Sequence, residues 1–128
     1  MLPLAHAPAW IVASVLLVAA VLYVSLAPLN ILAELPTHFD KVEHAAAYVF
    51  LAVWFTGLVA RPRYWLAAVA LVVLGLTIEF LQASMPFGRQ GDPWDVLANI
   101  TGIGVGLAIA SVATGGWALK VEAWLNRS

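Results

Sequence analysis

Long runs of apolar residues, separated by short polar or proline-rich segments, dominate the chain. Four runs are close to the roughly 20 residues that a helix needs to cross a bilayer. They comprise residues 9–27, 42–60, 64–83 and 95–114. Each run stops at residues that end or interrupt helices, namely Pro28, Arg61-Pro62-Arg63, Pro86 and Gly115-Gly116. The pattern predicts an all-α bundle of four transmembrane helices, and the runs lack the period-two alternation of a membrane β-barrel.

The C-terminal tail has a helical pattern of its own. Trp117, Val121, Trp124 and Leu125 recur on one helical face, while Lys120 lies on another. Such a pattern predicts a short interfacial helix that lies on the membrane surface. A frayed continuation of the fourth helix fits the same spacing, and the sequence leaves both interpretations open.

Composition supports a membrane setting. The chain is 63% hydrophobic and 10% charged, whereas soluble domains are about 45–50% apolar and about 25% charged. We expect residues 1–128 to form a single domain whose first helix is not a cleaved signal peptide, because no Lys or Arg precedes it. The absence of cysteine excludes disulfides and thiolate metal sites. No basic tract suggests a nucleic-acid partner, and no cofactor is expected.

The distribution of Lys and Arg predicts the orientation, since cytoplasmic loops are enriched in both. Arg61 and Arg63 lie between the second and third helices, and the C-terminal tail carries two further basic residues. The opposite side holds only Lys41 and Arg89, each beside acidic residues. We therefore expect both termini in the cytoplasm, with residues 29–41 and 84–94 facing outward.

Polar residues gather near the outward ends of the last three predicted helices. They are Asp40 and His44 on the second, Glu79 and Gln82 on the third, Asp95 and Asn99 on the fourth, with Arg89 and Asp92 in the loop between the third and fourth. An ionisable side chain inside the hydrocarbon costs about 2.5–3.5 kcal/mol, so we expect these groups to turn inward and meet. Gly102 and Gly106 would let the fourth helix approach a neighbour closely.

Each of these residues also has a purely structural interpretation. Glu79 can pair with Arg89, Asp95 can cap the fourth helix, and Asn99 can bind neighbouring helices. No metal site is expected, because His44 is the one histidine of the group. The convergence of the residues at one depth is what favours a functional site.

Three segments carry a resemblance to a known family. They are Asp40-Lys41-x-x-His44-x-x-x-Tyr48, Ile78-Glu79-Phe80-Leu81-Gln82, and Gly88-Arg89-x-x-Asp92-x-x-Asp95-x-x-x-Asn99-x-x-Gly102-x-x-x-Gly106. In order and spacing they resemble the VanZ-like family of bacterial membrane proteins, over roughly residues 40–110. The resemblance implies a four-helix fold in the bacterial cytoplasmic (inner) membrane. The family is named for a member linked to resistance against the glycopeptide teicoplanin, and the name brings no defined reaction.

Three functions then compete. In the first, the cluster binds a membrane lipid, an envelope precursor or a glycopeptide: Arg89 suits a phosphate or carboxylate, and Glu79, Asp92 and Asp95 suit an amine. In the second, the protein is an intramembrane enzyme acting on a lipid-linked substrate, with His44 and Glu79 as the catalytic acid–base pair. In the third, it is a scaffold for a partner membrane protein or for its own oligomer. The sequence leaves open whether the protein is an enzyme.

Overall fold

The computed structural model describes residues 1–27, 37–85 and 92–128, with side chains from residue 41 in the second of these segments. Regular structure in these segments is helical throughout. The long helices are α1 (Ala7–Leu26), α2 (Thr37–Leu58), α3 (Tyr64–Ser84, preceded by the 3-10 turn Arg61–Arg63), and α4 (Pro93–Ile109, continued by the π-helical turn Ala110–Thr114). A fifth, shorter helix, α5, comprises Trp117–Leu125. The predicted all-α class is therefore confirmed.

In the part of the chain that the structure describes, fewer helices are long and apolar enough to cross a membrane than the four that the sequence predicts. Among the described residues, three helical segments are long and apolar enough to cross a membrane: Ala7–Leu26, Arg61–Ser84 and Pro93–Thr114. The predicted second span, which lies in α2, is not one of them. The first turns of α2 hold polar residues, and the Thr56 side chain near its other end is fully buried. Because α3 and α4 pack against α2, part of its surface faces protein and need not be apolar.

The closest helix pair is α2 with α4, and two glycines bring the pair together. A methyl group at Gly102 would overlap the carbonyl oxygen of Ala45 on α2. One at Gly106 would lie 2.5 Å from the Ala52 methyl and 2.9 Å from the Val49 carbonyl oxygen. The predicted tight packing of the G-x-x-x-G step within the chain is confirmed, and its partner is α2.

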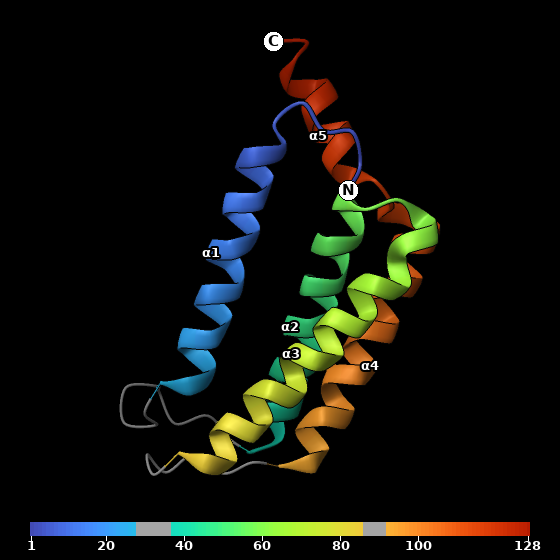
Figure 1. The fold of residues 1–128 in the computed structure, drawn as a ribbon. Helices are drawn as coiled ribbons and strands as arrows, with labels where there is room; N and C mark the ends of the chain where they lie inside the picture. The colour runs from blue at the N-terminus through green and yellow to red at the C-terminus, as the bar shows by residue number, and fades with distance from the viewer. Residues whose placement is uncertain (28–36, 86–91) are drawn as a thin grey trace.

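The apolar core lies where α2, α3 and α4 meet. It contains Tyr48, Leu51 and Ala52 from α2, Leu71 from α3 and Ile103 from α4. In Figure 1, α1 stands to one side of these three helices, and none of its residues is fully buried. Hydrogen bonds join it to α2 and α3: the Trp54 indole donates to the Ser14 hydroxyl at 2.9 Å, and the Gln82 amide donates to the Ser25 carbonyl at 2.7 Å.

The C-terminal segment is a separate helix and not a frayed end of α4. Gly116 adopts a left-handed conformation (φ 68°), which glycine tolerates best, and α5 begins at the next residue. Its buried face is Ala118 and Glu122, whereas Trp124 of the predicted apolar face is 68% exposed. α5 packs against α2. Both chain termini therefore lie at the same end of the bundle (Figure 1), here called the termini end.

Candidate functional site

The opposite end of the bundle carries most of the predicted site residues. There α2 begins, α3 ends and α4 begins (Figure 1). Because residues at neighbouring helix ends share one depth, side chains distant in sequence come together. We use the name polar cluster for the group Lys41, His44, Glu79, Asp92 and Asp95, and the name polar end for this end of the bundle.

Lys41 joins the two aspartates of the cluster. Its Nζ lies 2.6 Å from Asp92 Oδ2 and also donates a hydrogen bond to Asp95 Oδ1. The Asp95 side chain is only 7% exposed, and His44 Nε2 lies 3.8 Å from its second oxygen, Oδ2. A buried carboxylate requires such partners, because an isolated buried charge is unfavourable. Lys41 thus connects α2 to α4 and belongs to the site.

Glu79 connects the end of α3 to the start of α4. Its Oε1 accepts a hydrogen bond from the backbone N–H of Asp92. The carboxylate of Glu79 also lies within electrostatic range of Asp95 and His44. The ion pair that the sequence allows between Glu79 and Arg89 involves a residue, Arg89, that lies outside the described residues.

Asp92, and not Asp95, caps α4. Its Oδ1 accepts a hydrogen bond from the Trp94 N–H at 2.9 Å, while Asp95 lies in the first turn of the helix. The predicted capping role of Asp95 is therefore wrong, because α4 begins two residues earlier than its apolar run. The hydrogen bond from Lys41 is the largest influence on the Asp92 carboxyl and holds its pKa below its ordinary value.

Two further predicted residues, Gln82 and Asn99, lie outside the polar cluster. Gln82 is 4% exposed and donates a hydrogen bond to the Ser25 carbonyl of α1, so it fastens α1 to α3. Asn99 lies one turn deeper in α4 and is 5% exposed. Asp40 belongs to the first turns of α2, but its side chain lies outside the described residues, as does Arg89.

Sequence reasoning missed two participants. Lys41 belongs to the family motif and to the orientation argument but not to the predicted site residues, although its position three residues before His44 puts it on the same helical face. The second is Glu122 at the termini end. It is 5% exposed and accepts hydrogen bonds from the N–H groups of Ala5 (2.7 Å) and His6 (2.8 Å) and from the Trp10 indole (2.8 Å).

This arrangement, the N-terminal clasp, fastens the start of α1. The first helix has no side-chain cap of its own at His6, and Glu122 supplies the negative charge that a helix N-terminus favours. Burial raises the pKa of Glu122, but the hydrogen bonds from His6, Ala5 and Trp10 outweigh burial and hold the pKa below the ordinary value of 4.5. The one sequence signal for this role is that Glu122 is the single acidic residue of the C-terminal tail.

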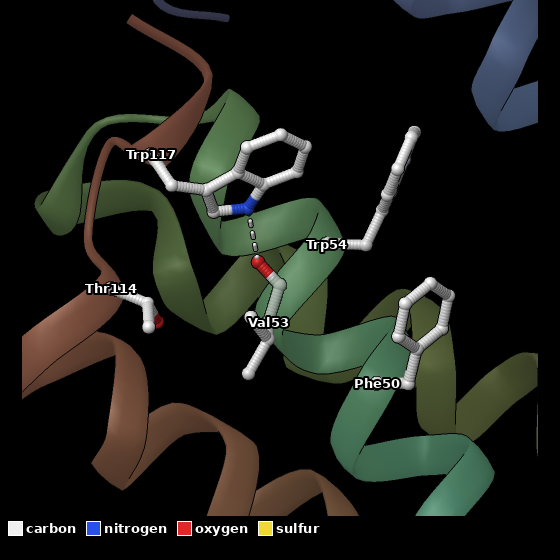
Figure 2. A pocket seen from close by; sticks show the side chains of 5 residues that line it. All are labelled: Phe50, Val53, Trp54, Thr114 and Trp117. Carbon is white, nitrogen blue, oxygen red and sulfur yellow. Dashed lines mark hydrogen bonds between the residues drawn. The ribbon is translucent and has the colours of Figure 1, made fainter. Parts of the chain in front are cut away.

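Two apolar hollows lie apart from the polar cluster. One, of about 220 Å³, is lined by Phe50, Val53, Trp54, Thr114 and Trp117. Figure 2 shows that the Trp117 indole donates to the Val53 carbonyl oxygen, at 2.9 Å. The other, of about 390 Å³, lies between α1 and Phe55 of α2. Neither is lined by an ionisable side chain, so both are weaker candidates for chemistry than the polar cluster.

Comparison with known proteins matches most of the chain to a family model. The model of the family described as VanZ/LLP1 matches residues 7–114, which include all four long helices and the whole polar cluster. No curated protein and no solved structure matches the chain. The three apolar helices and this match together indicate a membrane protein.

Proposed function

The chain belongs to the VanZ/LLP1 family, and from this premise we propose that it binds a charged envelope ligand at the polar cluster. The ligand class is an amine-bearing lipid head group or envelope precursor, and the cationic group of a glycopeptide such as teicoplanin. The observation that carries the proposal is Lys41 held between Asp92 and Asp95, with Glu79 and His44 close by.

The charge of the two ends supports both orientation and ligand. Six of the seven acidic residues lie between residues 34 and 95, and four of the six basic residues lie near the termini end. Positive charge is enriched on the cytoplasmic side of membrane proteins, so the polar end would face outward. Its excess of carboxylates favours a cationic group over a purely anionic one.

The cluster is suited to a head group that bears both an amine and a phosphate. A ligand ammonium can replace Lys41 Nζ on Asp92 and Asp95, because both are positively charged donors of hydrogen bonds to carboxylates. Lys41, once displaced, can bind the phosphate oxygens of the same head group. Phosphatidylethanolamine has this combination, whereas phosphatidylglycerol has the phosphate without the amine.

The experiment measures binding to purified protein with three probes: short-chain phosphatidylethanolamine, short-chain phosphatidylglycerol and teicoplanin. Asp92→Asn removes the charge but keeps a side chain that caps helices well, so the fold should survive. We expect this variant to bind phosphatidylethanolamine about tenfold or more weakly, as for the loss of one charged hydrogen bond. Glu43→Gln, an exposed acid at the same end, is the matched control.

Two outcomes would count against the proposal. One is equal binding of both phospholipids by the wild-type protein. The other is an equal loss in Glu43→Gln and Asp92→Asn, which would indicate general surface attraction. Weaker drug binding by the same variant, together with lower teicoplanin tolerance of cells that express it, would link the site to resistance.

Two alternative functions have one observation each in their favour. The His44–Asp95 approach of 3.8 Å provides an imidazole–carboxylate pair for an acid–base enzyme. The hydrogen bonds that Lys41 and Glu79 make between the ends of neighbouring helices would suit a scaffold, because a scaffold requires only a fixed arrangement of its helices. Glu79→Gln separates them: an enzyme loses turnover of a lipid-linked substrate at full folded yield, whereas a scaffold loses folded yield or assembly.

A further inference from the structure

The termini end of the bundle has a basic surface. Four of the six basic residues of the chain lie there, and all four are exposed: Arg61, Arg63, Lys120 and Arg127. Among the described residues, the one acidic side chain at this end is Glu122, which is 5% exposed and held in the N-terminal clasp. A group of basic residues beside membrane-spanning helices attracts anionic lipids. The surface that meets the lipid head groups at this end is therefore positively charged.

An apolar hollow lies just inside this basic surface. We use the name tryptophan hollow for the space of about 220 Å³ lined by Phe50, Val53, Trp54, Thr114 and Trp117 (Figure 2). Phe50 lies eight residues before the end of α2 at Leu58 and Val53 lies five before it, a depth of about 8–12 Å at the rise of an α-helix. Arg61 comes three residues after that end. The arginine and the hollow thus have the order in depth of a phosphate and an acyl chain.

The walls of the tryptophan hollow suit hydrocarbon. The indole N–H of Trp117 donates to the Val53 carbonyl oxygen, and that of Trp54 donates to the Ser14 hydroxyl. Because both N–H groups have partners, the two indoles present ring carbons to an occupant. A helix of a second copy is too large, since one helical turn about 10 Å across and 5.4 Å tall already exceeds the volume of the hollow. An acyl chain, which is narrow and apolar, fits the space.

Arg61 is the basic residue that lies beside the hollow. Its Nη2 donates a hydrogen bond to the Ser111 carbonyl oxygen at 2.5 Å. A methyl group built on Gly115 would lie 3.8 Å from Arg61 Nε, and Gly115 directly follows Thr114 of the hollow wall. The contact with Ser111 uses one of the five N–H groups of the guanidinium. The exposed guanidinium is therefore held next to the segment that lines the hollow, where it can donate to a phosphate.

We propose that the termini end binds one anionic phospholipid, with its phosphate on Arg61 and one acyl chain in the tryptophan hollow. Phosphate suits the planar fork of arginine, and burial of the chain against apolar walls is favourable. The basic surface repels the ammonium of phosphatidylethanolamine, whereas phosphatidylglycerol carries no positive group. The site lies at the opposite end of the bundle from the polar cluster, so it does not depend on the function proposed there.

The experiment uses lipids with brominated acyl chains, which quench tryptophan fluorescence on contact. Trp94 is the one tryptophan at the polar end, and it is 67% exposed. A Trp94→Phe background therefore leaves five tryptophans, all near the termini end, and keeps lipid bound at the polar cluster out of the signal. The purified protein in detergent is titrated with brominated phosphatidylglycerol or phosphatidylethanolamine. We expect phosphatidylglycerol to quench at a several-fold lower concentration, and equal quenching by the two lipids would refute the proposal.

Arg61→Gln and Arg63→Gln form a matched pair, because they remove the same charge from the same turn before α3. The titration is carried out in about 1 M salt, where the Debye length is about 3 Å, so an arginine that does not touch the phosphate contributes little. We expect Arg61→Gln to raise the half-quenching concentration about fivefold, as for one basic residue at a membrane surface, and Arg63→Gln to raise it less than about twofold. An equal effect of the two would indicate general attraction and overturn the proposal.

Thr114→Leu tests the place of the acyl chain by filling the tryptophan hollow. The Thr114 hydroxyl has no hydrogen-bond partner among the described residues, so the substitution breaks no such bond. The control is Ala19→Leu, which enlarges a side chain in the other hollow, between α1 and Phe55. We expect phosphatidylglycerol to quench Thr114→Leu no better than phosphatidylethanolamine does, and to quench Ala19→Leu as it does the background protein. Unchanged quenching of a Thr114→Leu protein with a background-like melting temperature would place the chain elsewhere and contradict the proposal.

Discussion

The approach of α4 to α2 at Gly102 makes a quantitative prediction. A methyl group at this position would overlap the carbonyl oxygen of Ala45 and lie 3.0 Å and 3.1 Å from its carbonyl carbon and Cα. These are backbone atoms, which cannot rotate away as the end of a side chain can. Gly102→Ala must therefore push the two helices apart, and such overpacking typically costs about 1–3 kcal/mol.

The matched control is Gly104→Ala, two residues further along α4. An added methyl at Gly104 meets nothing within 4 Å, so it crowds no neighbour. Both substitutions gain the same helix propensity, up to about 1 kcal/mol, and this gain cancels in the comparison. We expect Gly102→Ala to be less stable than Gly104→Ala by about 1–3 kcal/mol.

Unfolding in mixed micelles with increasing SDS measures this difference directly. The six tryptophans of the chain report the transition by fluorescence. Equal unfolding midpoints for the two alanine variants would refute the helix contact at Gly102. A Gly102→Leu variant that extracts and melts like wild type would refute it as well, since leucine needs far more room than alanine.

Two further predictions concern the ends of the bundle. A cysteine at Gln90 should label from outside in intact cells and one at Arg63 should not, because Arg63 contributes to the basic side; the reverse labelling would invert the orientation. Glu122→Gln should destabilise the protein at neutral pH. Because the folded pKa of Glu122 lies below 4.5, its charge stabilises the fold above that pH, and this contribution fades as the pH falls through the lowered value. The melting temperatures of wild type and Glu122→Gln should therefore converge in acid, and a constant gap would contradict the clasp.

The helices themselves were readable from the sequence, because long apolar runs have few alternatives to a bilayer helix. Their starts were less accurate: α2 begins at Thr37, five residues before its apolar run, because its first turns contain polar residues. The failure of α2 to qualify as a span has the same cause. Apolarity predicts contact with lipid, and α2 mainly contacts α3 and α4.

Membership of the polar end was also predictable, but individual partners were not. The depth of a residue follows from its distance to a helix end, which the sequence gives. Its partner depends on how each helix is rotated about its own axis, which the sequence gives only weakly. Thus Lys41, left out of the site, joins Asp92 and Asp95, whereas Gln82, placed in the site, binds α1 instead.

The polar cluster and the N-terminal clasp differ in which helices they hold together and in whether the family match includes them. The polar cluster brings together the ends of α2, α3 and α4, and all of it lies within the matched residues 7–114. The N-terminal clasp lies largely outside this range, because Ala5 and His6 precede residue 7 and Glu122 follows residue 114. Its hydrogen bonds join residues 116 and 117 positions apart, which no local pattern can encode. Because α1 has no fully buried residue, such polar attachments add to the packing of its partly buried side chains, such as Trp10 and Leu17, in holding it. The site at the polar end, by contrast, is built on the three helices that share the core.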